Sequence, residues 1–136
     1  AVTGSPDERV LAEQVAHDAG LPPRAVLAGR TGLAELAALV AGARLVVSGD
    51  TGVAHLATGY GTASVVLFGP VPAAHWGPPP DRPRHRALGT ISLTPVNRDS
   101  TGSGGVGTHP TLNAIGIDEV VAAVADVERV SGAVAA

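Results

Sequence analysis

The sequence predicts an α/β fold in which helices flank a parallel sheet. Short apolar runs alternate with longer segments of helical period, which is the pattern of stacked strand–helix units. The length of 136 residues suits one domain. Hydrophobic residues make up 45% of the chain and charged residues 15%, which is enough apolar material for a core. We therefore expect residues 1–136 to form a single α/β domain.

The first elements are a short apolar run and a helix. Ser5 is the expected N-cap and Pro6 suits the first helical position. Asp7 and Glu8 fall in the first turn, where carboxylates interact favourably with the helix dipole. The helix should end near Ala19, before a Gly and two Pro residues. Its expected apolar stripe consists of Leu11, Ala12, Val15, Ala16 and Ala19.

The middle of the chain predicts two further strand–helix units. Residues 25–27 form a short second strand, and a helix follows from about Leu33 until Gly42. Residues 44–47, Arg44 followed by the apolar run Leu45, Val46 and Val47, predict a strand that is covered on both faces. A third helix should run from about Gly52 to Tyr60, and a buried strand follows at residues 64–68.

The last part begins with a Pro-rich segment, residues 69–80, which we expect to be an irregular, rigid loop because proline lacks a backbone donor. Residues 84–88 form a last short strand. Residues 97–110 are linker-like, and we expect them to be flexible. Asp118 is the expected N-cap of a final helix. Its expected apolar face consists of Val120, Val121, Val124 and Val127.

The composition excludes several classes of function. The net charge is −3, and all nine cationic residues are Arg, which disfavours a nucleic-acid partner. The absence of Cys excludes disulfides, thiolate zinc sites and a Cys nucleophile. No apolar run reaches the roughly 18–20 residues that span a bilayer. We expect a soluble, cytoplasmic protein, and the missing Met at an abrupt start suggests a piece of a longer chain.

The most informative segment is residues 46–55, where a strand leads through a Gly-containing turn into a helix. Such a turn directs unpaired backbone N–H groups and the positive end of the helix dipole at one spot, which favours an anion. Gly49 and Gly52 let a ligand approach the backbone, the Thr51 hydroxyl can add a hydrogen bond, and His55 lies one turn into the helix. This turn lies at the carboxyl ends of the strands, where parallel α/β sheets bind ligands.

A purely structural interpretation of the same residues stays open at this point. Asp50 or Thr51 can serve only as the N-cap, and Gly52 only as a close-packing residue. The turn is neither a Walker A loop nor a G-x-G-x-x-G loop. Ser48, Asp50 and His55 are the residue types of a hydrolase triad, but they lack the G-x-S-x-G elbow, so we reject that alternative.

Two segments resemble a known family. Residues 45–57 read LVVSGDTGVAHLA and residues 61–70 read GTASVVLFGP. Together they resemble the signature of glycosyltransferase family 9, the heptosyltransferase-like enzymes of bacterial surface polysaccharide (lipopolysaccharide) biosynthesis. The resemblance covers roughly residues 1–88 and is most specific over residues 48–70.

The resemblance implies the donor-binding half of a GT-B enzyme, with a Rossmann-like sheet that lacks its first strand and helix. It implies a nucleotide-diphosphate sugar donor, typically ADP-heptose, and no required metal ion. Asp50 would contact the donor sugar, Thr51 and Gly52 the diphosphate, and His55 the cleft side. Glu35 is the candidate for the donor ribose. The implied substrate-binding set is Glu35, Ser48, Gly49, Asp50, Thr51, Gly52, Val53 and His55.

The resemblance also implies partners and leaves alternatives. The amino-terminal acceptor domain with its general base is absent from this chain, so we expect the chain alone to be inactive, and the intact enzyme can associate peripherally with a membrane. The first alternative is a non-catalytic nucleotide-binding or association module that forms homo-oligomers through exposed strand edges. The second is a half-domain of a sugar-nucleotide epimerase. Trp76 in the Pro-rich loop is a candidate to flank a nucleotide base or to clamp its own loop.

Overall fold

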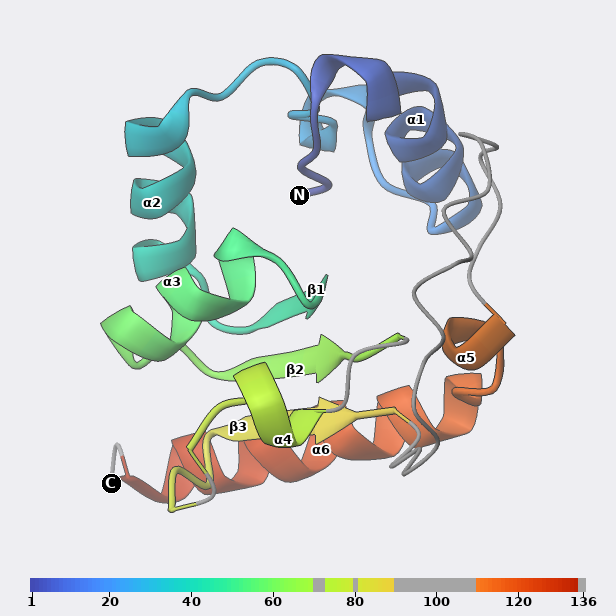
Figure 1. The fold of residues 1–136 in the computed structure, drawn as a ribbon. Coiled ribbons are helices and arrows are strands. Elements are labelled where there is room, and N and C mark those ends of the chain that lie inside the picture. Colours follow the sequence, from blue (N-terminus) through green and yellow to red (C-terminus); the bar gives the residue numbers. More distant parts are fainter. Residues whose placement is uncertain (70–72, 80, 90–109, 135–136) are drawn as a thin grey trace. The chain divides into compact units, whose positions relative to one another are not determined.

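The computed structural model describes residues 1–69, 73–79, 81–89 and 110–134 and divides the chain into two compact units (Figure 1). The first unit is Ala1–Leu39 and the second is Val40–Ala136. Each is described by itself. The expected flexible segment, residues 97–110, lies outside the described residues except for its last residue, Pro110.

The first unit begins with a capped helix. A 3-10 turn, Pro6–Glu8, leads into α1, Arg9–Asp18. Ser5 is the N-cap of the 3-10 turn, whereas Glu8 is the N-cap of α1, so the α-helix begins later than predicted. The backbone N–H of Ser5 donates to Glu8 Oε2 at 2.7 Å, which is one half of a capping box. This bond, together with the Ser5 hydroxyl, lowers the pKa of the Glu8 carboxyl from its usual 4.5.

The predicted apolar stripe of α1 is partly wrong. Ala12 and Ala16 are buried, but Leu11 is 58% exposed and Val15 is 47% exposed. The small residues pack against Val26 and Ala28 in a cluster of their own. Helical period alone did not identify the packed face, because this helix carries apolar residues on more than one face.

The predicted second strand is shorter than residues 25–27. A 3-10 turn occupies Pro23–Ala25, and only Val26 forms a parallel bridge, with Val2. The two flanking bonds run from Val2 N–H to Ala25 O and from Leu27 N–H to Val2 O, both at 2.8 Å. The helix that follows, α2, spans Leu33–Gly42 as predicted.

The second unit is built on a parallel sheet. Strands β1, Val46–Gly49, β2, Ser64–Leu67, and β3, His85–Leu88, lie in the order β1-β2-β3. Both pairs are parallel, with Val46 opposite Ser64 and Ser64 opposite His85. The three predicted strands of this region are confirmed to within about two residues at their ends. The expectation that β1 is covered on both faces is wrong, because Val47 is 48% exposed.

Helices cover both faces of this sheet. On one face, α6, Ile117–Val134, packs its Val127 and Ala123 against Val65 and Ala63 (Figure 1). On the opposite face, α3, Gly52–Tyr60, and α4, Ala73–Trp76, pack over Val66 and Phe68. Alternate residues of β2 thus point to opposite cores, as the pleat requires, and the predicted α/β class is confirmed.

Helix α6 is also joined to the sheet by two ion pairs. Arg44, just before β1, pairs with Glu128 at 2.9 Å, and Arg86 of β3 pairs with Asp126 at 3.7 Å. The predicted apolar face of this helix is correct except for Val121, which is 62% exposed. A short helix, α5, spans Pro110–Asn113 before it.

The Pro-rich segment contains one element that the sequence did not predict. Residues Ala73–Trp76 form a single helical turn, α4, where we expected irregular structure. The turn falls in the one stretch of this segment that has no proline, so the backbone donors that a helix needs are present there. Among the helices of the described ranges, none has the length and apolar character needed to cross a membrane.

Candidate functional site

The predicted turn lies between β1 and α3. Strand β1 ends at Gly49, Asp50 is partly buried, and Thr51 is the N-cap of α3 with extended backbone angles (φ −143°, ψ 175°). The helix begins at Gly52, as the sequence predicted. Asp50 therefore precedes the cap position and is accessible from solvent.

The carboxyl end of α3 is fixed by a Gly in the left-handed region. Gly61 has φ +70°, and its N–H reaches Thr58 O at 3.3 Å. The N–H of Thr62 donates to Ala57 O at 2.9 Å, which completes a Schellman motif. The side chain of Arg82 adds a bond to Thr58 O at 3.1 Å. These bonds hold α3 in place and orient its amino end.

The amino end of α3 is open. The Thr51 side chain makes no capping hydrogen bond, and the Thr51 carbonyl accepts the N–H of Ala54 at 3.0 Å. Within the described residues, no partner is found for the N–H groups of Gly52 and Val53. A Cβ placed on Gly52 would meet no atom within 4 Å. Close packing within the described part of the chain therefore does not explain this glycine.

Ser48, at the end of β1, carries a buried polar atom. Its Oγ has no hydrogen-bond partner among the described residues. Ser48 stands opposite Val66 in the register, so its side chain lies on the sheet face that α3 covers. An orphaned hydroxyl of this kind costs about 1–3 kcal/mol unless a water or a ligand satisfies it.

One face of α3 carries three polar side chains in a row. Thr51, His55 and Thr58 follow the spacing i, i+4, i+7, which places them on one side of a helix. Thr51 and His55 are exposed, whereas Thr58 is partly buried and donates its hydroxyl to Ala54 O at 3.0 Å. We call these three residues the polar stripe of α3. The polar stripe runs along α3 from its open amino end toward its carboxyl end.

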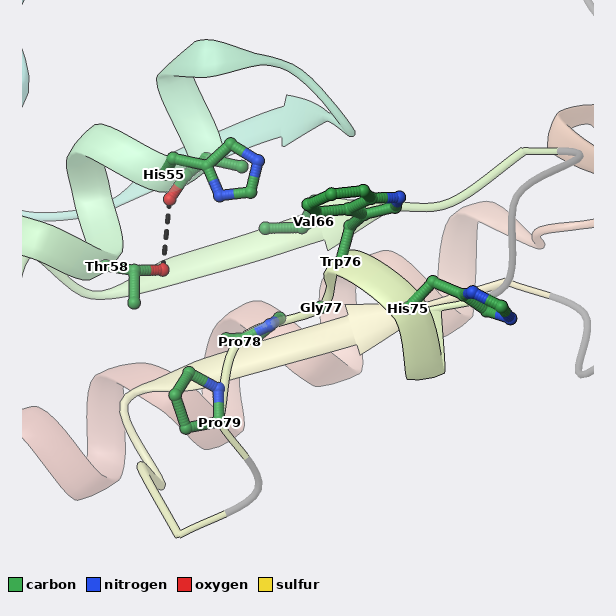
Figure 2. A pocket seen from close by; sticks show the side chains of 9 residues that line it. His55, Thr58, Val66, His75, Trp76, Gly77, Pro78 and Pro79 are labelled. Atoms are coloured by element: carbon green, nitrogen blue, oxygen red, sulfur yellow. Dashed lines mark hydrogen bonds between the residues drawn. The ribbon is translucent and has the colours of Figure 1, made fainter.

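A pocket of about 320 Å³ lies against this stripe. Figure 2 shows the imidazole of His55 and the indole of Trp76 at the same hollow, with Thr58 farther along α3. The pocket lies between α3 and the segment that contains α4. It is lined by Ala54, His55, Thr58, Val66, His75, Trp76, Gly77, Pro78 and Pro79.

Backbone bonds hold the pocket wall that faces α3. The N–H of Gly77 donates to Ala73 O at 2.6 Å, and a Cβ on Gly77 would collide with that carbonyl. The N–H of Arg82 donates to Pro79 O at 3.1 Å, while its side chain reaches Thr58 O on α3. The wall is thus anchored at both ends without the use of the Trp76 side chain, which is 63% exposed.

The predicted site residues fall into two groups. Residues 48–53 and His55 are consecutive parts of one strand–turn–helix unit in the second unit of the chain. Glu35 belongs to α2 in the first unit, where its carboxylate folds back over Gly32. Its proposed contact with a ribose stays a prediction. The pocket was not predicted, although the spacing of Thr51, His55 and Thr58 was a signal for it.

Three arginines before and within β3, Arg82, Arg84 and Arg86, make contacts within the fold. Arg82 caps the carboxyl end of α3, and Arg86 pairs with Asp126. The carbonyl of Arg84 accepts the N–H of Ser64 at 2.9 Å. In the part of the chain that the structure describes, no group of three or more His, Asp or Glu side chains is arranged to hold a metal ion.

Comparison with known families decides the assignment. The model of glycosyltransferase family 9 (heptosyltransferase) matches residues 1–98. The chain belongs to glycosyltransferase family 9. This match includes the open amino end of α3 and the segment that lines the pocket. It confirms the family that the two sequence segments indicated.

A solved structure supports the fold of this family 9 chain. The ADP-heptose lipopolysaccharide heptosyltransferase II of E. coli is similar, with a TM-score of 0.71 and 22% sequence identity. The match covers 96% of this chain and 36% of the E. coli chain, so the family 9 chain spans about a third of that enzyme's length. No curated protein matches the sequence.

Proposed function

We propose that the open amino end of α3 binds the diphosphate of a nucleotide-diphosphate sugar. In the intact protein, a heptose-type sugar would then be transferred to a surface polysaccharide or another acceptor. Membership of family 9 supports the reaction class, and the similarity to the E. coli ADP-heptose heptosyltransferase suggests ADP-heptose as the donor. The observation that carries the proposal is the uncapped amino end of α3 with open space at Gly52.

The chemistry of this turn suits a diphosphate. The N–H groups of Gly52 and Val53 offer two donors to phosphate oxygens, and the helix dipole adds about half a positive charge there. Negative charge grows on the departing nucleotide diphosphate during transfer, so preorganised donors stabilise the transition state more than the ground state. In this proposal the Thr51 hydroxyl adds a third donor, and Asp50 binds hydroxyl groups of the sugar.

The proposal assigns only the donor half of the reaction to this chain. An acceptor-binding domain would supply the general base, so the chain alone should bind donor without turning it over. By the family resemblance, the proposal includes no metal ion. Activity of the intact protein should therefore survive chelation by EDTA.

A pair of glycine variants tests the binding site. Gly52 and Gly59 both lie in α3, and a Cβ on either would meet no atom within 4 Å. Gly52→Val places a side chain at the proposed diphosphate site, whereas Gly59→Val places it elsewhere on the same helix. We expect Gly52→Val to weaken ADP binding about tenfold or more in calorimetry, because it blocks approach to the backbone donors. Gly59→Val should bind ADP as the unmodified chain does.

Two further results would contradict the proposal. Equal ADP affinity of the two valine variants would show that the amino end of α3 is not the diphosphate site. Unchanged transferase activity of the intact protein after Asp50→Ala would remove the assigned role of Asp50. Product analysis with the intact protein separates a transferase from a sugar-nucleotide epimerase, because only the transferase forms a glycosylated acceptor, whereas the epimerase forms an isomer of the sugar.

A further inference from the structure

The pocket beside α3 begins at Ala54 and His55, close to the proposed diphosphate site at Thr51, Gly52 and Val53. His55 lines the pocket and follows Thr51 by four residues on the polar stripe. One helical turn rises about 5.4 Å, so His55 lies about one turn from the cap residue on the same face. A ligand with its phosphates at the amino end of α3 can therefore extend along the stripe into the pocket.

The lining of the pocket indicates an uncharged ring. Among its nine lining residues there is no carboxylate and no guanidinium, and the only ionisable side chains are the imidazoles of His55 and His75, so the lining favours an uncharged ring over a strongly charged group. Trp76 is 63% exposed and offers an aromatic surface, and Pro78 and Pro79 add apolar contact. The volume of about 320 Å³ is at the lower end for ligand pockets, which suits one ring rather than a whole nucleotide sugar.

The position of the pocket distinguishes between the two kinds of ring in such a donor. The transferred sugar is bonded directly to the terminal phosphate, whereas the base is separated from the phosphates by a ribose. A pocket one turn from the diphosphate is within reach of the directly bonded ring. Its polar side chains are His55, Thr58 and His75. The Thr58 hydroxyl already donates to Ala54 O, whereas the imidazole of His55 can donate to or accept from a sugar hydroxyl.

We propose that the pocket between α3 and α4 receives the sugar ring of the donor, with the C–H face of the ring stacked on Trp76 and a hydroxyl bonded to His55. This inference rests on the proposed function and adds a residue that determines which sugar is accepted. Trp76 is free for this role because the wall is anchored by the Gly77 N–H to Ala73 and by Arg82 to Thr58.

The emission of Trp76 tests the inference directly, since Trp76 is the one Trp of the chain. The chain is titrated with ADP-heptose, ADP and AMP while tryptophan fluorescence and binding heat are recorded. We expect ADP-heptose to change the emission at saturation, and ADP and AMP to leave it unchanged even though ADP gives binding heat. An equal change with ADP and AMP would assign the pocket to the base and overturn the inference.

Variants separate this inference from the proposed function. Trp76→Ala should weaken ADP-heptose about tenfold and leave ADP affinity unchanged, because only the sugar loses its stacking surface. Trp76→Phe should restore most of that loss. Tyr60→Ala is the matched control, since Tyr60 is a 55% exposed aromatic residue of α3 outside the pocket.

The outcomes point to different conclusions. If ADP-heptose and ADP bind but Trp76→Ala weakens neither, the sugar-ring pocket is wrong and the diphosphate site stands. If Trp76→Ala weakens both equally, the pocket contributes to the whole nucleotide and the assignment to the sugar fails. If the unmodified chain binds neither compound, the proposed function fails, and the inference that rests on it fails as well.

Discussion

Two single residues, Ser64 and His85, form a buried polar pair between β2 and β3. Ser64 Oγ lies 2.9 Å from His85 Nδ1, and the two residues are 0% and 7% exposed. Burial lowers the pKa of His85 from its usual 6.5, and the charges of Arg82 and Arg84 lower it further. The unfolded chain therefore takes up this proton at a higher pH than the folded chain does.

We predict that acidification destabilises the fold through His85. Neutral His85 contributes to the free energy of unfolding, and this contribution should be fully present above pH 6.5. It should be lost as the pH falls from 6.5 toward the lowered pKa of the folded state. Urea unfolding at a series of pH values measures this loss. The His85→Gln variant should not show this loss of stability at low pH. The His17→Gln variant, changed at a side chain that is 83% exposed, should still show it. A loss that persists in His85→Gln would contradict the prediction.

Gly77 is the residue that shapes the pocket wall. Because a Cβ at this position would collide with Ala73 O, Gly77→Ala must displace the backbone of α4. We expect a loss of about 1–3 kcal/mol in the free energy of unfolding, typical of overpacking, and a shifted Trp76 emission. Gly59→Ala, in open space on α3, should instead be neutral or stabilise by about 0.4–1 kcal/mol. Unaltered emission and stability of Gly77→Ala would show that this wall is not tightly built.

At the scale of elements, α6 is held mainly by apolar packing. Val127 is 0% exposed against the sheet, whereas its neighbour Glu128 forms an ion pair with an Arg44 side chain that is 83% exposed. We predict that Val127→Ala costs about 2 kcal/mol, from two lost methyl groups and the cavity they leave. Glu128→Gln should cost less than about 1 kcal/mol, because exposed pairs contribute little. Chemical denaturation of both variants checks this order, and a larger loss for Glu128→Gln would reverse it.

The elements that the sequence predicted best are those with local signals at both ends. Helix α3 has the predicted bounds because Thr51 precedes it and Gly61 adopts the left-handed conformation after it. Helix α4 was missed because prolines around it outweighed the short proline-free stretch. The second strand was predicted at residues 25–27, but only Val26 forms a bridge. Strand pairing depends on neighbouring strands, which the local sequence pattern does not specify.

The candidate site was predictable in part for the same reason. Residues 48–55 are contiguous, so the strand–turn–helix pattern located them together before the structure did. The pocket depends on Trp76, which is 21 residues from His55 in the sequence and comes near it only through the tertiary fold. The sequence pattern also did not predict which apolar side chains are exposed. Leu11 and Val121 were expected to be packed, yet they are 58% and 62% exposed.

At the scale of the whole molecule, β1 is the edge strand of the sheet in the second unit. Within the described residues β1 pairs only with β2, and its Val47 is 48% exposed. An edge strand presents unpaired N–H and C=O groups that can pair with another chain, and an apolar side chain favours that contact. These features favour self-association of the chain through β1, in line with the alternative of an association module.

We predict reversible self-association that a charge at the edge suppresses. Sedimentation velocity over a wide range of chain concentration should show an average mass that rises with concentration. Val47→Lys should shift the chain toward monomer, because a lysine on an edge strand opposes pairing. Val121→Lys adds the same charge at a 62% exposed valine on α6, away from the edge, and should leave the association unchanged. A strictly monomeric chain would refute self-association. If both lysine variants reduced self-association equally, its cause would be general apolar exposure and net charge rather than pairing of the β1 strands.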